Sequence, residues 1–219
     1  MLPSGSLRVG WRIEPCIYIP GGLSGTGSIA VQLAKPVFGV GKVITTLSTE
    51  KLAKFDELSA EGTAEQIIDH TKQDPATAIE RNSVDFLLDT MIMAMASLNL
   101  MKKDSVIVTI TGLPFGDSLA KVPLPALARG ALGCMDAIKE WRASRPGVNI
   151  KFLFVEPSAE HLDRLRQWVN EGKLRPAVGR IVEFRRLEDV RGGCTDVFNG
   201  KGNVGKFVVE VIRDPTKLE

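Results

Sequence analysis

Short runs of apolar, often β-branched residues alternate with segments of helical periodicity, and this alternation constrains the fold more than any other feature of the sequence. Several runs, such as VDFLLD and SVIVTI, are almost continuously apolar. Strands of that kind are typical of parallel sheets that helices cover on both faces. The pattern predicts six strands, over Cys16–Pro20, Lys42–Thr46, Gln66–Asp69, Val84–Asp89, Ser105–Ile110 and Asn149–Val155.

Helical patterns lie between and after these runs. They predict helices over Ser28–Lys35, which Pro36 ends, and over Thr49–Leu58, Ala94–Met101 and Ala126–Ala143. A further helix begins behind Ser158 as N-cap residue and is closed by Gly172. Because crossovers between parallel strands are right-handed, few topologies remain. The sequence therefore predicts an α/β protein with a Rossmann-type, doubly wound, parallel six-stranded sheet.

The regular alternation of strand and helix patterns ends after Gly172. A strand over Val178–Phe184, a weak helix over Leu187–Asn199 and a strand over Lys206–Ile212 form a short mixed C-terminal segment. We therefore expect a lead-in over residues 1–14, a dinucleotide-binding domain over 15–172 and a C-terminal remnant of the catalytic-domain lobe over 173–219.

Composition excludes several classes of function. The chain has 219 residues, a net charge of +2 and no basic stripe with interleaved aromatic residues, so nucleic acid is not an expected partner. Its three cysteines are scattered and it has only two histidines, which argues against a disulfide framework and a zinc site. No secretory signal and no membrane-length apolar stretch occurs, so we expect a cytoplasmic protein that does not contact the membrane.

The densest motif is the glycine-rich stretch IPGGLSGTG between the first strand and the first helix. Free N–H groups at a helix start, together with the helix dipole, bind phosphate, and glycines let the backbone approach it closely. Aligned with G-x-G-x-x-G, the stretch places Gly22 and Gly27 at the first and last glycine and Ser24 in place of the middle one. The alternative is a purely structural turn that packs the helix on the sheet.

The residues after the second strand bear on the choice between NAD and NADP. NAD enzymes place a carboxylate at this strand end to bind the ribose hydroxyls. Here the stretch is Thr46-Leu47-Ser48-Thr49-Glu50-Lys51, in which Ser48 and Lys51 are candidates to hold a 2′-phosphate. The alternatives are an N-cap role for Ser48 and a solvated charge for Lys51.

Several stretches, from about Leu7 to Ile212, together resemble one family: GSIAVQLAK, VITTLSTEK, QIIDHTKQD, VDFLLDT and EGKLRPAVGR…GKFVVEV. They are similar to zinc-free medium-chain dehydrogenases/reductases of the quinone-oxidoreductase branch. The resemblance implies NADPH-dependent reduction of quinones or of C=C bonds conjugated to a carbonyl, without zinc. It also implies a homodimer joined at the sixth strand, although that edge lies away from the cleft.

The resemblance also implies roles for individual residues. Gly22, Ser24, Thr26 and Gly27 match the pyrophosphate turn. Ser48 and Lys51 match the 2′-phosphate contacts, and His70 replaces a tyrosine that usually helps there. The expected contacts along the cofactor toward the nicotinamide are Thr90, Thr111 with Gly112, Phe154, Val155 and Asn203.

The sequence departs from the family in three respects. From the sequence we expect no counterpart of the family's N-terminal catalytic domain, which covers the nicotinamide. Ser24 adds a Cβ and a hydroxyl at the pyrophosphate turn, and a positive φ there would cost about 1–3 kcal/mol. The loop after the fourth strand becomes Met91-Ile92-Met93-Ala94-Met95, whose side chains either fill the cofactor's space or pack a helix start.

Three hypotheses on function therefore remain open. The first is the NADPH-dependent reductase, acting on a small apolar, enone or quinone substrate. The second is a non-redox enzyme, of isomerase or cyclase type, that reuses the cleft with polar groups such as Asp89, Thr111 or His70. The third is a non-catalytic remnant. The sequence identifies no catalytic residue, and Tyr18, the sole tyrosine, is expected in the core.

Overall fold

The computed structural model describes residues 14–58, 62–112, 122–200 and 204–211. Six parallel strands form one sheet in the order β3-β2-β1-β4-β5-β6. This order is that of a Rossmann fold, and it confirms the predicted fold class. The six strands are β1 Cys16–Ile19, β2 Lys42–Leu47, β3 Gln66–Asp69, β4 Val84–Asp89, β5 Met101–Thr109 and β6 Asn149–Phe152.

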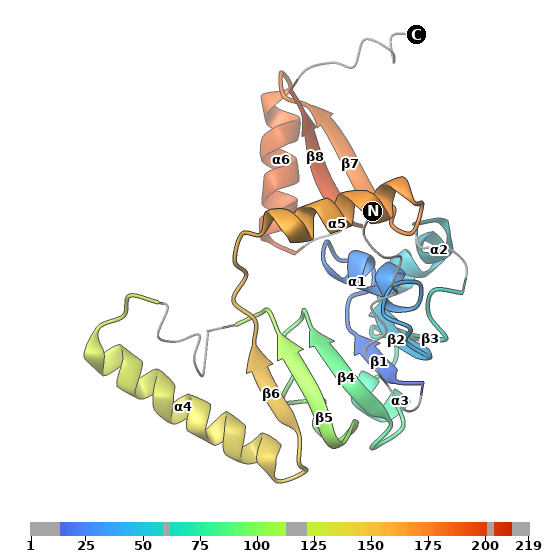
Figure 1. The fold of residues 1–219 in the computed structure, drawn as a ribbon. Helices are drawn as coiled ribbons and strands as arrows, with labels where there is room; N and C mark the ends of the chain where they lie inside the picture. Colours follow the sequence, from blue (N-terminus) through green and yellow to red (C-terminus); the bar gives the residue numbers. More distant parts are fainter. Residues whose placement is uncertain (1–13, 59–61, 113–121, 201–203, 212–219) are drawn as a thin grey trace.

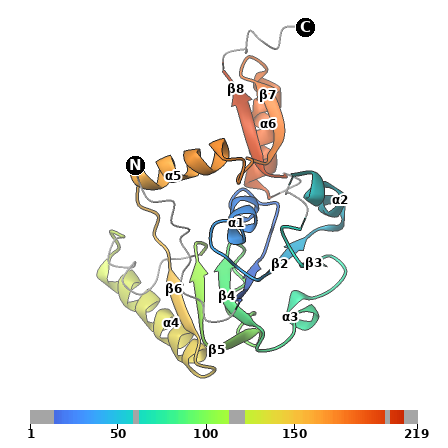
Figure 2. The same cartoon turned by 45° about the vertical axis from the view of Figure 1, so that its right-hand side comes forward.

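Five helices accompany the sheet: α1 Gly27–Ala34, α2 Thr49–Leu58, α3 Pro75–Ala78, α4 Ala126–Ser144 and α5 Ala159–Asn170. Helix α1 packs on β1 and β2, whereas α4 lies beside the edge strand β6 (Figure 1). Helix α5 crosses the carboxyl-end side of the sheet, as Figure 2 also shows. Among the described residues, no helix is both long and apolar enough to span a bilayer.

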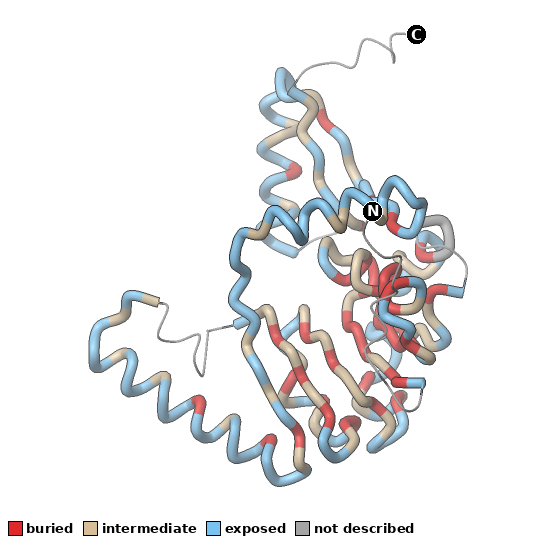
Figure 3. The backbone as a smooth tube through the Cα atoms, viewed as in Figure 1, coloured by how far each residue is buried: buried red, intermediate tan, exposed pale blue. Residues whose placement is uncertain are grey.

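The core lies on both faces of the sheet, and β1 shows why. Its neighbouring residues Tyr18 and Ile19 are both 0% exposed, yet they belong to different apolar clusters. Since neighbouring side chains of a strand point to opposite faces, β1 is covered on both sides. Burial raises the pKa of the Tyr18 phenol to about 12, as a core role requires. Figure 3 shows the buried residues concentrated in the strands and α1.

The predicted helix over Ala94–Met101 is wrong. The segment 94–100 forms successive turns, and Met101 is already the first residue of β5. Leu100 and Met101 are completely buried, so tertiary packing overrides the local helical pattern. Strand β5 therefore starts four residues before the predicted Ser105.

The other predicted boundaries differ by shorter segments. Strand β6 ends at Phe152 instead of Val155, although the Leu153 N–H still donates to the Thr109 carbonyl. The short helix α3 was not predicted. Its Asp74 carboxylate accepts from the Ala76 N–H at 2.9 Å, with Pro75 at the first position.

Helix α5 starts as predicted behind Ser158, whose hydroxyl accepts from the His161 N–H at 3.3 Å. Its residues Leu165 and Trp168 pack against a small cluster that includes Leu33 and Leu174. The ring of Trp168 also meets Phe38 edge-on, with centroids 6.3 Å apart.

The C-terminal segment forms a small βαβ unit: β7 Val178–Glu183, α6 Leu187–Phe198 and β8 Lys206–Glu210, with β7 and β8 parallel. The unit stands beyond the carboxyl ends of the large sheet (Figures 1 and 2). The Gly205 N–H donates to the Leu23 carbonyl at 2.8 Å, and Val204 is buried in the same cluster as Leu23. The described part of the segment thus packs on its own chain.

Candidate functional site

The candidate site lies where the strand order reverses. The chain leaves β1 toward β2 on one side, while β4 lies on the other side of β1. In open α/β sheets ligands bind in the crevice at this position, beyond the carboxyl ends of the strands. The glycine turn follows β1, and the loop beginning at Thr90 follows β4. The Thr90 hydroxyl donates to the Pro20 carbonyl at 2.7 Å and so ties the two loops together.

Two glycines of the turn are required by close backbone approach. A Cβ on Gly22 would lie 2.3 Å from the Thr45 hydroxyl oxygen, and a Cβ on Gly27 would lie 2.1 Å from the Gly21 carbonyl oxygen. Gly21 itself has a φ of +72°, a conformation that favours glycine. These residues therefore press the start of α1 against the ends of β1 and β2.

Ser24 uses part of the helix start for itself. Its hydroxyl oxygen accepts from the Gly27 N–H at 2.9 Å, and its carbonyl accepts from the Ser28 N–H at 3.0 Å. Ser24 does not lie in the left-handed region, so the backbone strain considered from the sequence is absent. The Ser24 hydroxyl instead binds the first N–H of α1, so the Gly27 N–H is not available to a ligand in this arrangement, while the N-cap residue Thr26 makes no side-chain cap hydrogen bond.

Two other N–H groups of the turn stay open. Within the described residues, the N–H groups of Gly25 and Thr26 have no acceptor, and Thr26 is exposed. The first turn of α1 carries no acidic residue. Two open donors at the positive end of a helix dipole favour an anion. Of the three N–H groups of Gly25, Thr26 and Gly27, the turn thus keeps two that could serve an anion.

A lysine from β8 lies over the same turn. A Cβ on Gly25 would lie 2.8 Å from Nζ of Lys206 and 3.4 Å from its Cε. The sequence analysis missed this residue because Lys206 lies far along the chain from the turn. Only the docking of β8 through Gly205 brings it there.

The loop after β4 covers the other end of the turn. The Cγ and Sδ atoms of Met91 lie 3.4 Å from the position of a Cβ on Gly21. Ile92 is 73% exposed and has a φ of +61°, which is strained for a β-branched residue. No helix starts here, so Met91 fills space beside the turn, and the alternative of helix packing is not met.

Asp89 holds this loop in place. Its carboxylate accepts from the N–H groups of Met91, Met93 and Ala94 at 3.1, 2.8 and 3.1 Å. Because Asp89 is only 1% exposed and its oxygens are engaged, it does not act on a substrate in this arrangement. Thr111, also predicted at the site, accepts from the Ile92 N–H at 3.2 Å and so fixes the same loop.

Three predicted residues gather around the end of β2. Ser48 lies between β2 and α2 and is half-buried. Its carbonyl accepts from the Lys51 N–H at 2.8 Å. The exposed His70 is linked to the same end, because its N–H donates to the Leu47 carbonyl at 3.0 Å. The backbone thus brings Ser48, Lys51 and His70 together.

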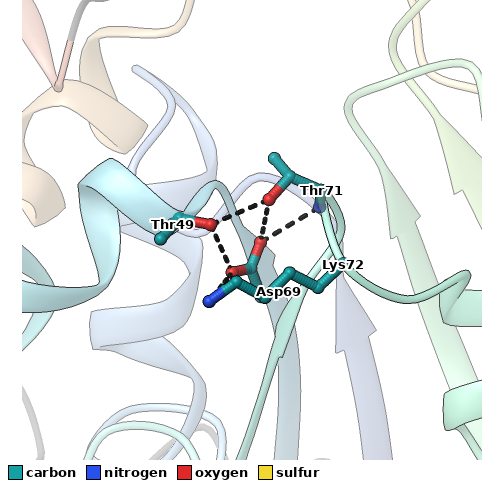
Figure 4. Close-up of polar contacts among 4 residues, drawn as sticks. All are labelled: Thr49, Asp69, Thr71 and Lys72. Atoms are coloured by element: carbon teal, nitrogen blue, oxygen red, sulfur yellow. Dashed lines mark hydrogen bonds and ion pairs between the residues drawn. The ribbon is translucent and has the colours of Figure 1, made fainter.

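A carboxylate beside this group was missed. Asp69 ends β3 opposite Leu47, and its oxygens accept from the hydroxyls of Thr49 at 2.5 Å and Thr71 at 2.6 Å (Figure 4). Lys72 Nζ lies 3.5 Å away. The hydrogen bond from Thr49, followed by that from Thr71, lowers the pKa of the carboxyl to about 2. Asp69 therefore holds the start of α2 through Thr49 as a group that is ionised at neutral pH.

The remaining predicted residues lie farther along the sheet or outside the description. Phe154 and Val155 follow β6 and are 41% and 75% exposed. Asn203 lies outside the described residues. Within the described ranges, no group of three or more His, Cys, Asp or Glu side chains is arranged to hold a metal ion.

Comparison with known proteins gives a family match. A family model described as zinc-binding dehydrogenase matches residues 63–209. An NADPH-dependent alkenal/one oxidoreductase of Arabidopsis thaliana is 33% identical over 108 residues, which are 49% of this chain and 26% of that protein. Reticulon-4-interacting protein 1 of Caenorhabditis elegans is 28% identical over 193 residues, covering 85% of this chain and 50% of that protein.

A solved structure agrees with this match. The quinone oxidoreductase of Coxiella burnetii superposes with a TM-score of 0.66 and 26% identity, over 90% of this chain and 53% of that one. The chain thus spans between a quarter and about half of the relatives it matches.

Proposed function

Because this chain belongs to the zinc-binding dehydrogenase family of medium-chain dehydrogenases/reductases, we propose that it binds NADPH and serves in the reduction of quinones or conjugated enones. Relatives named as an alkenal/one oxidoreductase and a quinone oxidoreductase support this substrate class. The observation that carries the proposal is the pair of open N–H groups, on Gly25 and Thr26, at the reversal of the strand order.

The residues of the turn fit a pyrophosphate. The Gly25 and Thr26 amides would donate to its oxygens, while Gly22 and Gly27 keep Cβ atoms out of the contact between helix and sheet. Ser24 withdraws the Gly27 N–H, which lowers the affinity of the turn for an anion. When bound, NADPH supplies the hydride for the reduction.

The end of β2 fits a 2′-phosphate better than two free ribose hydroxyls. Ser48 offers a hydroxyl that makes no hydrogen bond with any described residue, and Lys51 adds a positive charge one helical turn later. The nearby carboxylate of Asp69 is held by Thr49 and Thr71 and does not replace the missing acidic residue at the strand end.

Toward the nicotinamide, this chain's residues position the loops that follow β4 and β5. The Thr90 hydroxyl fixes the β4 loop to Pro20, and Thr111 fixes Ile92. Phe154 and Val155 present exposed apolar side chains beyond β6, which suit contact with the face of the nicotinamide ring. Asn203, which lies outside the described residues, remains a predicted contact to the cofactor.

A homodimer joined at β6 is part of the proposal. Among the described strands β6 pairs with β5 alone, so it is the edge strand of the sheet at which a second chain could add its own β6. The neighbouring helix α4 exposes Leu127, Met135, Ile138 and Trp141. Sedimentation equilibrium should give a mass of two chains, and a monomer at all concentrations contradicts the dimer.

A second candidate is the non-redox enzyme that reuses the cleft for an apolar substrate. Two observations favour it, namely the hydrogen bond of the Ser24 hydroxyl with the Gly27 N–H and the placement of Met91 over Gly21. Both reduce the room and the donors available to a dinucleotide.

Cofactor titration separates the two candidates. The fluorescence of NADPH and of NADH is followed as each is titrated with the protein and with two variants, Lys51→Met and the control Lys54→Met, whose lysine lies exposed on the same helix. The proposal expects NADPH to bind at least about tenfold more tightly than NADH. Lys51→Met should reduce that preference and Lys54→Met should leave it. Absence of NADPH binding contradicts the reductase and favours the second candidate.

A further inference from the structure

The strongest unassigned surface of the molecule is the outer face of helix α4. The helix has 19 residues, of which only Asp136 and Ala143 are buried. Four large apolar side chains of the helix are between 51% and 88% exposed: Leu127, Met135, Ile138 and Trp141. We propose that this face binds an anionic membrane surface, on which α4 lies flat. Such a contact goes beyond the proposed function and does not depend on cofactor binding.

The exposed apolar residues share one side of α4. At about 100° per residue, Leu127, Ile138 and Trp141 fall within about 60° of one another around the helix axis, opposite the buried residues. The other residues on the outer side are small and exposed: Gly130, Ala131, Cys134 and Ala137. Figures 1 and 2 show α4 at the periphery of the molecule, beside the edge strand β6. In the part of the chain that the structure describes, no element covers this side, as the exposure of its side chains shows.

The charges of α4 complement an anionic surface. The helix and its C-cap residue expose three arginines, Arg129, Arg142 and Arg145, and one carboxylate, that of Glu140. Asp136, the other acidic residue of the helix, is buried on the inner side. Arg142 and Arg145 lie on the side of the apolar residues, within the last turn. A layer of anionic headgroups would therefore meet the arginines while the apolar side chains enter the edge of the hydrocarbon.

Trp141 and Arg145 form a pair that suits the headgroup region. The guanidinium carbon of Arg145 lies 4.9 Å from the centroid of the Trp141 ring. Both side chains combine an apolar body with a polar or charged tip, and such side chains concentrate where hydrocarbon meets headgroups. The carboxyl end of α4 thus carries the side-chain types that hold a helix in the plane of a membrane interface.

A second copy of the chain fits this face less well. In an antiparallel pair of α4 helices, Arg142 and Arg145 would meet the positive amino end of the other helix, whose first turn carries no acidic residue. In a parallel pair the arginines would meet each other. The proposed joint at β6 uses the edge of the strand instead, and a dimer of that kind would carry two such helices.

Contact with a membrane surface needs less apolar length than a span does. The sequence lacks a stretch long enough to cross a bilayer, and the expectation of no membrane contact rested on that lack. A helix that lies in the interface needs only one apolar side with basic residues beside it, and α4 has both. Because apolar quinones and enones partition into bilayers, this contact would bring the proposed reductase to its substrate.

The test measures binding of the purified full chain to lipid vesicles by co-sedimentation. One set of vesicles is phosphatidylcholine alone, and the other contains about a third phosphatidylserine. Two double variants alter the face of α4. Ile138→Gln with Trp141→Gln removes apolar area, and Arg142→Gln with Arg145→Gln removes two charges.

Matched controls lie in the C-terminal βαβ unit. Phe198 of α6 is 91% exposed, and Phe198→Gln removes apolar area away from α4. Arg185 and Arg186 are exposed residues before α6, and Arg185→Gln with Arg186→Gln changes the net charge as the α4 variant does. The melting temperature of each variant is compared with that of the wild type.

We expect the wild type to bind the anionic vesicles and to bind the neutral ones at least about tenfold less tightly. Loss of Arg142 and Arg145 should weaken binding to the anionic vesicles about twentyfold, since each basic residue at such a surface contributes about fivefold. Loss of Ile138 and Trp141 should weaken binding at least about tenfold, because apolar area no longer enters the bilayer. The controls should bind as the wild type does, and every variant should keep its melting temperature.

Quenching of tryptophan fluorescence by brominated lipid gives a second reading that does not depend on the double variants. Trp141→Phe keeps an apolar ring, so it should still bind the anionic vesicles, but its fluorescence should be quenched less than that of the wild type. Unchanged quenching in this variant would contradict contact at α4.

Two further results overturn the proposal. One is a wild type that binds neither kind of vesicle. The other is vesicle binding that both α4 variants leave unchanged, because another surface would then carry it. Sedimentation equilibrium tests the alternative occupant: if the α4 variants turn a dimer into a monomer while the wild type binds no vesicle, a second copy covers the face.

Discussion

Removing the hydroxyl of Ser24 should make the protein less stable and its cofactor site stronger. The Ser24 hydroxyl accepts from the Gly27 N–H at 2.9 Å, and loss of such a hydrogen bond costs about 1 kcal/mol of unfolding free energy. For a chain of this size that corresponds to a drop of about 2–4 °C in melting temperature. The freed N–H can then donate to a phosphate oxygen, a charged hydrogen bond that tightens binding about tenfold.

Two variants separate the hydroxyl from the Cβ. Ser24→Ala removes only this hydrogen bond, and Ala is tolerated because Ser24 does not adopt a left-handed conformation. Ser24→Gly removes the Cβ as well. Thermal denaturation without ligand and NADPH titration by fluorescence measure the two effects. Equal tightening in both variants assigns the effect to the hydroxyl, whereas tightening in Ser24→Gly alone assigns it to crowding. A melting temperature that falls in Ser24→Ala with no gain in affinity refutes the account of the turn.

Three further predictions concern stability. Gly27→Ala should lower the unfolding free energy by about 2 kcal/mol, because its Cβ would lie 2.1 Å from the Gly21 carbonyl oxygen. The control Gly130→Ala lies in the exposed α4 with nothing near its Cβ and should raise the unfolding free energy by about 0.5–1 kcal/mol. Similar effects of the two substitutions in urea unfolding would contradict this. Asp69→Asn should have a lower unfolding free energy than the wild type at neutral pH. The difference should disappear as the pH falls from about 4 to about 2, because the folded-state pKa of Asp69 lies below the ordinary value of 3.8. A difference in unfolding free energy that persists in acid would contradict the role of the charge. Ile92→Asn should raise the melting temperature by about 2 °C, since asparagine tolerates the φ of +61° and the isoleucine is largely exposed; a lower melting temperature means that the loop needs the isoleucine.

The sheet was predictable because its physics is local. A continuous apolar run such as Val84–Asp89 predicts a strand from its own residues, and the apolar periodicity of Thr49–Leu58 predicts a helix in the same way. Right-handed crossovers then leave little choice of strand order. The prediction for the segment before β5 was wrong because the start of this strand depends on tertiary packing and not on its local sequence. Lys102, Lys103 and Asp104 are polar, so the strand was expected to begin only at Ser105, whereas its start is set by the burial of Met101.

The site was predictable only in part. The glycine turn and the cluster of Ser48, Lys51 and His70 follow from motif position along the chain. The contact of Lys206 with the turn depends on how a distant strand docks, and local patterns carry no information on that. The direction of the Ser24 hydroxyl, toward the Gly27 N–H instead of the cofactor's space, also required coordinates.

The central claim is that the backbone amides of Gly25 and Thr26 hold the cofactor's pyrophosphate. The most direct measurement is the ¹H–¹⁵N spectrum of the protein during NADPH addition, with these two amides assigned. We predict that their signals shift most and saturate together with the cofactor's fluorescence. Unchanged signals from both amides at saturating NADPH would place the cofactor elsewhere and contradict the account.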